Sequence, residues 1–146
     1  KQLAVTQLNT VELRTYFHDL CRTISASMID DPKRITLEDI VDKTTTNSDV
    51  SVSMGLIVTE LVINAIKHAF PDQSAGGKIT VAFADKGGAW LLSVSDNGTG
   101  VPAGSMPVKP GLGTGIVEAL SKQLEASVTV LDQSPGTRVE IRHGQS

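Results

Sequence analysis

The sequence has little cysteine, few aromatic residues and no excess of positive charge. Its single cysteine, Cys21, excludes an intramolecular disulfide and any cysteine-based zinc site. Thirteen basic residues against sixteen acidic ones give a formal net charge of -3, so we expect no general attraction to nucleic acid or to anionic lipid. The most apolar stretch, residues 54–70, contains a carboxylate, a carboxamide, an ammonium group and an imidazole, which argues against a membrane span.

What remains is the composition of one folded domain. The chain has 146 residues, of which 40% are hydrophobic and 20% charged, and this size suits a single core. The first ten residues contain no apolar run, so we expect no signal peptide and a cytoplasmic location. Because the chain begins with Lys1 rather than Met, we expect a piece of a longer protein, made of one domain over residues 1–146.

Hydrophobic spacing in the first half predicts two helices and a strand. Apolar residues at steps of three and four predict a helix over residues 11–27, with Asn9 or Thr10 as its cap. Residues 34–41 are compatible with a β-strand, and the polar stretch that follows them, residues 44–49, is typical of a loop. A long helix is then predicted over residues 52–70, ended by a proline.

The second half predicts two hairpins with a helix between them. The strands are expected at residues 78–84 and 90–95, and then at residues 127–131 and 137–143. The intervening helix begins near Ile116. One layer of helices on one face of a mixed or antiparallel sheet would bury every apolar stripe, so the predicted fold class is α+β, a two-layer α/β sandwich.

The long helix carries four polar side chains on one narrow arc. Relative to Glu60, at 100° per residue, Asn64 lies at about +40°, Lys67 at about -20° and His68 at about +80°. Nearly all the other positions are apolar, so the helix is expected to be buried on most sides. The arc is either the exposed edge of a core helix or a groove that holds phosphates and a metal ion, with the Asn64 oxygen as a ligand of Mg²⁺.

A carboxylate at the end of a predicted strand is the second candidate. Asp96 shares strand parity with Trp90, Leu92 and Val94, so its side chain should point toward the core. The glycine-containing turn at residues 97–100 would let backbone approach a ligand. Asp96 either caps its own turn or accepts a hydrogen bond from the amino group of a planar base.

A second glycine-rich segment, residues 111–115, directly precedes a predicted helix. Its backbone N–H groups could cradle phosphates, although its spacing fits neither the Rossmann nor the Walker pattern, and a flexible connector would have the same composition. Near the end of the chain, Thr137 shares strand parity with Val139 and Ile141, which places its hydroxyl inward, where it could join Asp96 at a ligand.

Taken together and in this order, the four signals resemble the ATP-binding domain of the GHKL superfamily, which includes histidine kinases, gyrase B and MutL. ELVINAIKHAF resembles the N box, DNGTG the first glycine box, GLGTGIVEAL the second, and the GT at 136 and 137 the last element. The likeness covers roughly residues 50–143 and is strongest to sensor histidine kinases of the HWE-related group. It implies a Bergerat-type ATP-binding fold with a lid over residues 97–113.

The resemblance also implies roles for particular residues. Asn64 would bind Mg²⁺, Glu60 would help to position the metal, its water or the γ-phosphate, and Lys67 would complete the catalytic set. Asp96 would recognise the adenine amino group of ATP or ADP. The remaining cofactor-binding residues would contact the base or wrap the phosphates: His68, Gly98, Gly100, Gly111, Leu112, Gly113, Thr114, Gly115 and Thr137.

A histidine kinase also needs an acceptor histidine. His18 has no second long helix between it and the binding helix, so we interpret it as a helix-surface histidine. The acceptor helices are therefore expected upstream, in a protein that dimerises through them and passes its phosphoryl group to a response regulator, while this chain alone stays monomeric and cannot phosphorylate itself. An anti-sigma-factor serine kinase, a GHKL ATPase of the gyrase or MutL type and a degenerate interaction module are the alternatives.

Overall fold

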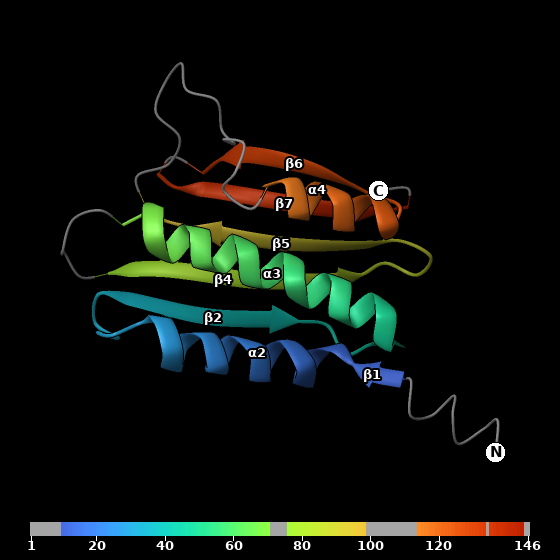
Figure 1. The fold of residues 1–146 in the computed structure, drawn as a ribbon, viewed down its shortest axis with the longest axis horizontal. Coiled ribbons are helices and arrows are strands. Elements are labelled where there is room, and N and C mark those ends of the chain that lie inside the picture. Colours follow the sequence, from blue (N-terminus) through green and yellow to red (C-terminus); the bar gives the residue numbers. More distant parts are fainter. Residues whose placement is uncertain (1–9, 71–75, 99–113, 134, 145–146) are drawn as a thin grey trace.

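The computed structural model describes residues 10–70, 76–98, 114–133 and 135–144. Figure 1 shows the helices lying over a sheet whose strands run along the long axis of the molecule. In chain order the elements are β1 (Thr10–Glu12), α2 (Leu13–Met28), β2 (Ile35–Val41), β3 (Thr45–Asn47), α3 (Ser48–His68), β4 (Gly77–Asp85), β5 (Trp90–Asp96), α4 (Thr114–Gln123), β6 (Ala126–Asp132) and β7 (Thr137–His143).

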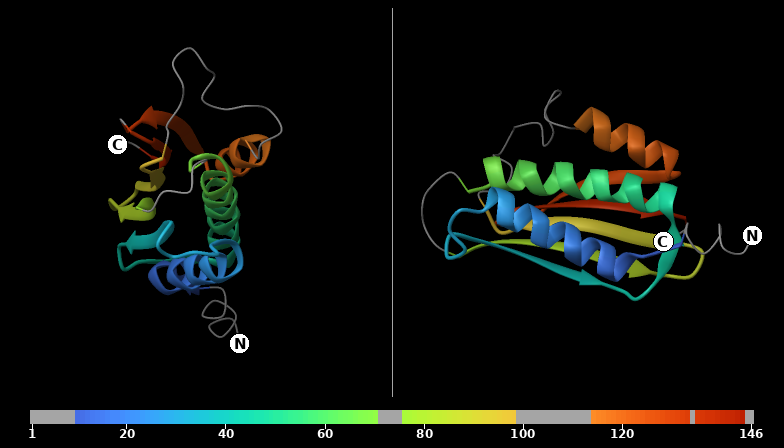
Figure 2. Two further views of the ribbon diagram at one scale, coloured as in Figure 1. Left: turned by 90° about the vertical axis from the view of Figure 1, so that its left-hand side faces the viewer. Right: turned by 60° about the horizontal axis from the view of Figure 1, so that its bottom comes forward.

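Five strands form the main sheet, in the order β2, β4, β5, β7, β6. β2 pairs with β4 in parallel, and the remaining neighbours are antiparallel. The views in Figure 2 show α2, α3 and α4 on one face of this sheet, and no helix of the described residues covers the opposite face. The predicted two-layer α+β sandwich with a mixed, mostly antiparallel sheet is therefore confirmed.

The core lies between the two layers. The predicted stripe of α2 faces it, since Leu13, Phe17 and Ile24 are buried. Across the layers, the Phe17 ring lies 6.2 Å from that of Phe83 on β4, measured between centroids. Burial, with the nearby Asp39 charge as a smaller cause, raises the pKa of the Cys21 thiol to about 12, so this thiol stays protonated and unreactive at neutral pH.

α3 crosses the middle of the sheet between α2 and α4 (Figure 1). It approaches α2 closely at Gly55, where an added Cβ would lie 2.4 Å from the Tyr16 hydroxyl oxygen. Within the described ranges it is the one helix long and apolar enough to cross a membrane, with a mean hydropathy of 1.6. Core helices of folded domains pass the same test, and the buried side of α3 packs here on the sheet.

Three local predictions were wrong. Neither Asn9 nor Thr10 caps α2: the cap position is Glu12, which follows β1 and makes no side-chain cap bond, and Asn9 lies outside the described residues. The predicted loop at residues 44–49 contains β3, which pairs with β1 through contacts between distant segments that a local pattern does not reveal. α3 also begins four residues earlier than predicted, because the Asn47 side chain accepts a hydrogen bond from Val50 N–H.

Candidate functional site: the C-terminal half of α3 and the end of β5

The four predicted polar side chains of α3 lie along one side of its C-terminal half. Glu60 and Asn64 are half buried, whereas Lys67 and His68 are exposed in the last turn. Within the described part of the chain, Glu60, Lys67 and His68 have no hydrogen-bond or ion-pair partner. This end of the helix therefore presents a carboxylate, a carboxamide oxygen and two basic groups that are compatible with a metal ion and phosphates.

The N-terminal half of α3 differs from its prediction. The helix was expected to be apolar and buried on nearly all sides, but Val52 and Leu56 are exposed to 51% and 49%. The sheet covers only one side of the helix, and α2 and α4 flank it without closing over the top (Figure 2). The polar arc is consequently part of a wider exposed side.

Asp96 ends β5, opposite Ile79 of β4. Its Oδ1 atom accepts hydrogen bonds from the backbone N–H of Gly98 at 3.0 Å and of Thr137 at 3.3 Å. Within the described residues, no donor reaches its Oδ2 atom. Burial raises the pKa of Asp96, and the two backbone hydrogen bonds oppose that shift only in part.

Asp96 is thus half buried, with one oxygen held by hydrogen bonds and the other without a donor among the described residues. Thr137 contacts it through the backbone N–H, whereas the sequence predicted a contribution from the hydroxyl. The hydrogen bond from Gly98 N–H is the bond expected if Asp96 caps its own turn, so this alternative stays open. A planar group with an amino donor would satisfy the second oxygen.

Two glycines allow the chain to close around Asp96. A Cβ at Gly98 would lie 2.1 Å from the carbonyl oxygen of Ala69, the residue that ends α3. A Cβ at Gly136, whose φ is +103°, would lie 1.8 Å from the carbonyl oxygen of Asp96. The first contact brings the polar end of α3 next to the end of β5, so the structure unites the first two sequence signals.

Sequence reasoning missed Gly136 and Asn97 as parts of this site. The signal for Gly136 was present, since it precedes Thr137 in the GT pair. Asn97 was passed over as a turn residue, but its Oδ1 accepts from Lys78 N–H at 2.7 Å and its Nδ2 donates to the Gly76 carbonyl at 3.0 Å. The Asn97 side chain therefore connects the end of β5 to the start of β4 by two hydrogen bonds.

The second glycine-rich segment is described only in its last residues. Thr114 begins α4, and Gly115 follows it with open space where a Cβ would be. Glycine at 115 is therefore not required by contacts with the described residues. The other predicted phosphate-binding residues lie outside the described residues, and so does most of the predicted lid: Gly100, Gly111, Leu112 and Gly113.

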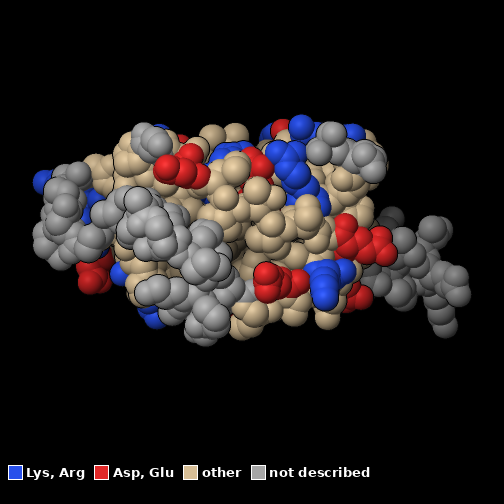
Figure 3. Space-filling view, turned by 90° about the horizontal axis from the view of Figure 1, so that it is seen from above, with Lys and Arg blue, Asp and Glu red and all other residues tan. Residues whose placement is uncertain are grey.

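Charge and metal-binding groups outside this region offer no competing site. Among the described residues there is no cluster of three or more histidine, cysteine, aspartate or glutamate side chains. On the side of the molecule that carries α4 and β6, acidic and basic side chains are interspersed (Figure 3).

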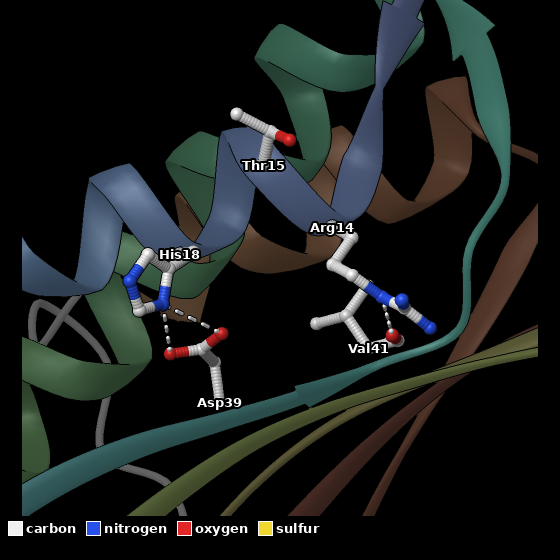
Figure 4. A pocket seen from close by; sticks show the side chains of 5 residues that line it. All are labelled: Arg14, Thr15, His18, Asp39 and Val41. Atoms are coloured by element: carbon white, nitrogen blue, oxygen red, sulfur yellow. Dashed lines mark hydrogen bonds and ion pairs between the residues drawn. The ribbon is translucent and has the colours of Figure 1, made fainter.

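A pocket between α2 and β2 surrounds the histidine that was considered as an acceptor. Figure 4 shows His18 pointing toward Asp39, with its Nδ1 atom 3.1 Å from the Asp39 Oδ1 atom. The His18 side chain is 53% exposed, which agrees with its interpretation as a helix-surface histidine. Among the described residues that line this pocket, there is no group of three or more potential metal ligands.

Comparisons with known proteins bear on the family and the fold of the chain. Residues 49–144 match the family described as "Histidine kinase-, DNA gyrase B-, and HSP90-like ATPase". The sensor histidine kinase PdtaS of Mycobacterium tuberculosis is 36% identical over 118 residues, which are 78% of this chain and 23% of PdtaS. The chain therefore spans about a quarter of the length of this curated relative.

Solved structures give the same result. The histidine kinase domain of the Erythrobacter litoralis EL346 blue-light activated histidine kinase has a TM-score of 0.79 and 27% identity, covering 91% of this chain and 61% of that one. The mycobacterial sensor histidine kinase MprB has the same fold, with a TM-score of 0.69 at 22% identity over 92% of this chain and 95% of that one. The resemblance predicted from the four motifs is confirmed, and the EL346 match is consistent with the HWE-related group.

Proposed function

Because the chain belongs to the family of histidine kinase-, DNA gyrase B- and HSP90-like ATPases, we propose that it holds Mg-ATP between the C-terminal half of α3 and the end of β5. The observation that carries this proposal is the Asp96 carboxylate. One of its oxygens is fixed by two backbone N–H groups, and the other has no donor among the described residues. The amino group of adenine is such a donor, whereas guanine presents a carbonyl oxygen at the equivalent ring position and would be rejected.

The phosphates would then extend toward α3. Asn64 would bind Mg²⁺ through its side-chain oxygen, and Glu60, one turn earlier, would orient the metal, its water or the γ-phosphate. Lys67 and His68 would lie near the phosphates, together with the backbone of residues 111–115. Bound Mg²⁺ supplies positive charge that offsets the charge developing on the transferred phosphoryl group, and the protein contributes mainly position.

For the whole protein we propose the activity of a sensor histidine kinase. This chain would present the γ-phosphate of ATP to an acceptor histidine on helices that precede residue 1, and the phosphoryl group would pass to a response regulator. Dimerisation would belong to those helices, and this domain would work in the cytoplasm without touching the membrane. The names of the similar proteins support this proposal.

The proposal is tested by calorimetric titration of this chain with ATP and ADP, with and without Mg²⁺. Titration with GTP is the control for base preference. We expect saturable binding that prefers adenine and strengthens with Mg²⁺, without phosphorylation of the chain itself. Binding of GTP as tightly as ATP would contradict the role of Asp96. Absence of nucleotide binding by folded protein would favour the degenerate interaction module.

The proposed role of Asn64 as a ligand of Mg²⁺ is tested with a separate variant. Asn64→Ala should keep the fold and bind ADP equally well with and without Mg²⁺, because it lacks the side-chain oxygen that would reach the ion. Thr59→Ala on the same helix is the control, since the Thr59 hydroxyl is already bonded to the Gly55 carbonyl at 2.8 Å. Mg-dependent binding that survives in Asn64→Ala would remove Asn64 from the metal site.

A further inference from the structure

Arg34 lies outside every sequence motif, yet it contacts both ends of the connection between α3 and β4. Its guanidinium donates a hydrogen bond to the carbonyl oxygen of Phe70, two residues after the last residue of α3. Its own backbone carbonyl accepts a hydrogen bond from Gly77 N–H at 2.8 Å, at the start of β4. A guanidinium beside the C-terminal end of a helix also interacts favourably with the unpaired carbonyls there.

The backbone that Arg34 contacts directly follows α3 and lies close to the end of β5. Phe70 is buried, and its ring lies so close to Gly77 that an added Cβ there would be 3.0 Å from two ring carbons. The preceding residue, Ala69, is the one whose carbonyl leaves no room for a Cβ at Gly98. A shift of the Phe70 backbone would therefore change the position of Ala69 relative to Gly98.

Asn97 completes a closed ring of contacts. Its side chain joins the end of β5 to Gly76 and Lys78 at the start of β4. Gly76 N–H in turn donates to the Lys33 carbonyl at 3.2 Å, next to Arg34. The ring runs from the end of α3 through Arg34 to β4, through Asn97 to β5, and back to α3 at Gly98.

We propose that Arg34 is a positioning residue for the nucleotide site, acting through Phe70 and Ala69. It fixes the end of α3, which carries Asn64 and Lys67, relative to Asp96 on β5. This inference rests on the proposed function, because it requires one ligand to contact both parts. Such a ligand gains affinity when the two parts are already held in place, whereas a ligand that contacts only Asp96 does not.

The test compares a ligand that reaches both parts with one that reaches only β5. Mg-ADP and adenosine are titrated into wild type and Arg34→Gln, with binding followed by NMR chemical shifts. In Arg34→Gln the affinity for Mg-ADP should fall about tenfold, while that for adenosine stays within about twofold of wild type. Arg34→Lys keeps a donor with positive charge and should recover part of the loss, and it serves for the same comparison if Arg34→Gln does not fold.

Arg14 provides a matched control at the other end of β2. Its Nε donates to the Val41 carbonyl at 2.9 Å (Figure 4). Like Arg34, it is therefore an arginine whose side chain bonds to the backbone carbonyl of a residue distant in the sequence. Arg14→Gln should lose comparable thermal stability and bind both ligands as wild type does. Equal weakening of Mg-ADP and adenosine in Arg34→Gln, or an unchanged affinity for Mg-ADP, would overturn the positioning role alone. Failure of wild type to bind either ligand would instead overturn the proposed function, and this inference with it.

Discussion

Two carboxylates on neighbouring strands are both at least partly buried, but they differ in their hydrogen-bond partners and in the direction of their pKa shifts. Glu140, in β7, has a side chain that is 8% exposed, and each of its oxygens accepts from an arginine, Arg138 Nε at 2.7 Å and Arg142 Nη2 at 2.8 Å. The hydrogen bond from Arg138 is the main reason that the pKa of Glu140 is lowered. Asp96, at the end of β5, has no cation beside it among the described residues, and its pKa is raised by burial.

The difference separates a structural carboxylate from one suited to a ligand. Each oxygen of Glu140 accepts a hydrogen bond from an arginine, so its charge is compensated within the fold. Asp96 keeps an open oxygen in a partly desolvated position, which costs stability and makes a hydrogen bond to an incoming donor stronger than it would be in water. The two pKa shifts have opposite directions because Glu140 has arginine partners, whereas Asp96 has no cation beside it among the described residues.

The largest expected effect is on nucleotide affinity in Asp96→Asn. The amide oxygen can still accept from Gly98 and Thr137, but the amide nitrogen then faces the adenine amino group, donor against donor. We expect affinity for ATP to fall by about a hundredfold, measured by calorimetry. Because the charge that burial disfavours is gone, the melting temperature at neutral pH should stay the same or rise.

Glu140→Gln is the matched control for this result, since it neutralises the other carboxylate. It should bind ATP as wild type does, because its side chain lies among arginines in the middle of β7. Similar losses of affinity in both variants would erase the distinction between the two carboxylates.

The next effect concerns the backbone around Asp96. Gly136→Ala should destabilise the fold by about 3 kcal/mol, because it adds a clash with the Asp96 carbonyl to the strain of a positive φ. Gly87→Ala, with a φ of +82° and open space around it, carries the strain alone and should cost about 1 kcal/mol. Chemical denaturation measures both, and equal costs would show that the close approach at Asp96 relaxes without penalty.

A smaller effect is expected on stability in Glu140→Gln. Both arginine hydrogen bonds lose their charged acceptor, but the arginine side chains are 28% and 35% exposed and can turn to water. We therefore expect a loss of about 1–2 kcal/mol in the free energy of unfolding at neutral pH. A variant as stable as wild type would show that the two ion pairs only compensate for the burial of the carboxylate.

The smallest expected effect is the pH dependence of stability in Glu140→Gln and Asp96→Asn, each compared with wild type. The Glu140 pKa is lowered, so its stabilisation is present above its unfolded value of about 4.3 and is lost as the pH falls through the folded value. The Asp96 pKa is raised, so its destabilisation is absent below its unfolded value of about 3.9 and develops as the pH rises through the folded value.

Melting temperatures measured from about pH 3 to about pH 7 should show this contrast. As the pH rises, the melting temperature of wild type should increase relative to that of Glu140→Gln. Over the same range, it should decrease relative to that of Asp96→Asn. Slopes of the same sign would contradict one of the two pKa assignments.

Most of the fold was predictable from the sequence because periodicity reports burial directly. The steps of three and four in α2, the alternation in β4 and β5 and the two turn sequences each reflect a local property of the chain. β1 and β3 were missed because each has only three residues, and their pairing depends on contacts between distant segments. The exposed face of α3 was missed because an apolar helix pattern does not show how much of the helix its neighbours will cover.

The candidate site was predictable in its chemistry and less so in its construction. Parity placed Asp96 correctly, and its polar neighbours on α3 were found from their shared arc. The sequence did not reveal that Thr137 acts through its backbone, because a hydrogen bond from N–H leaves no trace in residue type. Arg34 and Asn97 escaped notice for a related reason: both bond to main-chain atoms, and any residue could supply those atoms.

The aromatic contact at the opposite end of β5 gives the molecule a built-in optical reporter. Trp90 is the only tryptophan of the chain, and its ring stacks on that of His143 with centroids 5.3 Å apart. Six residues of extended strand, about 20 Å, separate it from Asp96. Its fluorescence should therefore report the separation of β7 from β5 during unfolding and should not change when a ligand binds near Asp96. Folding and ligand binding can then be measured separately in one unlabelled sample.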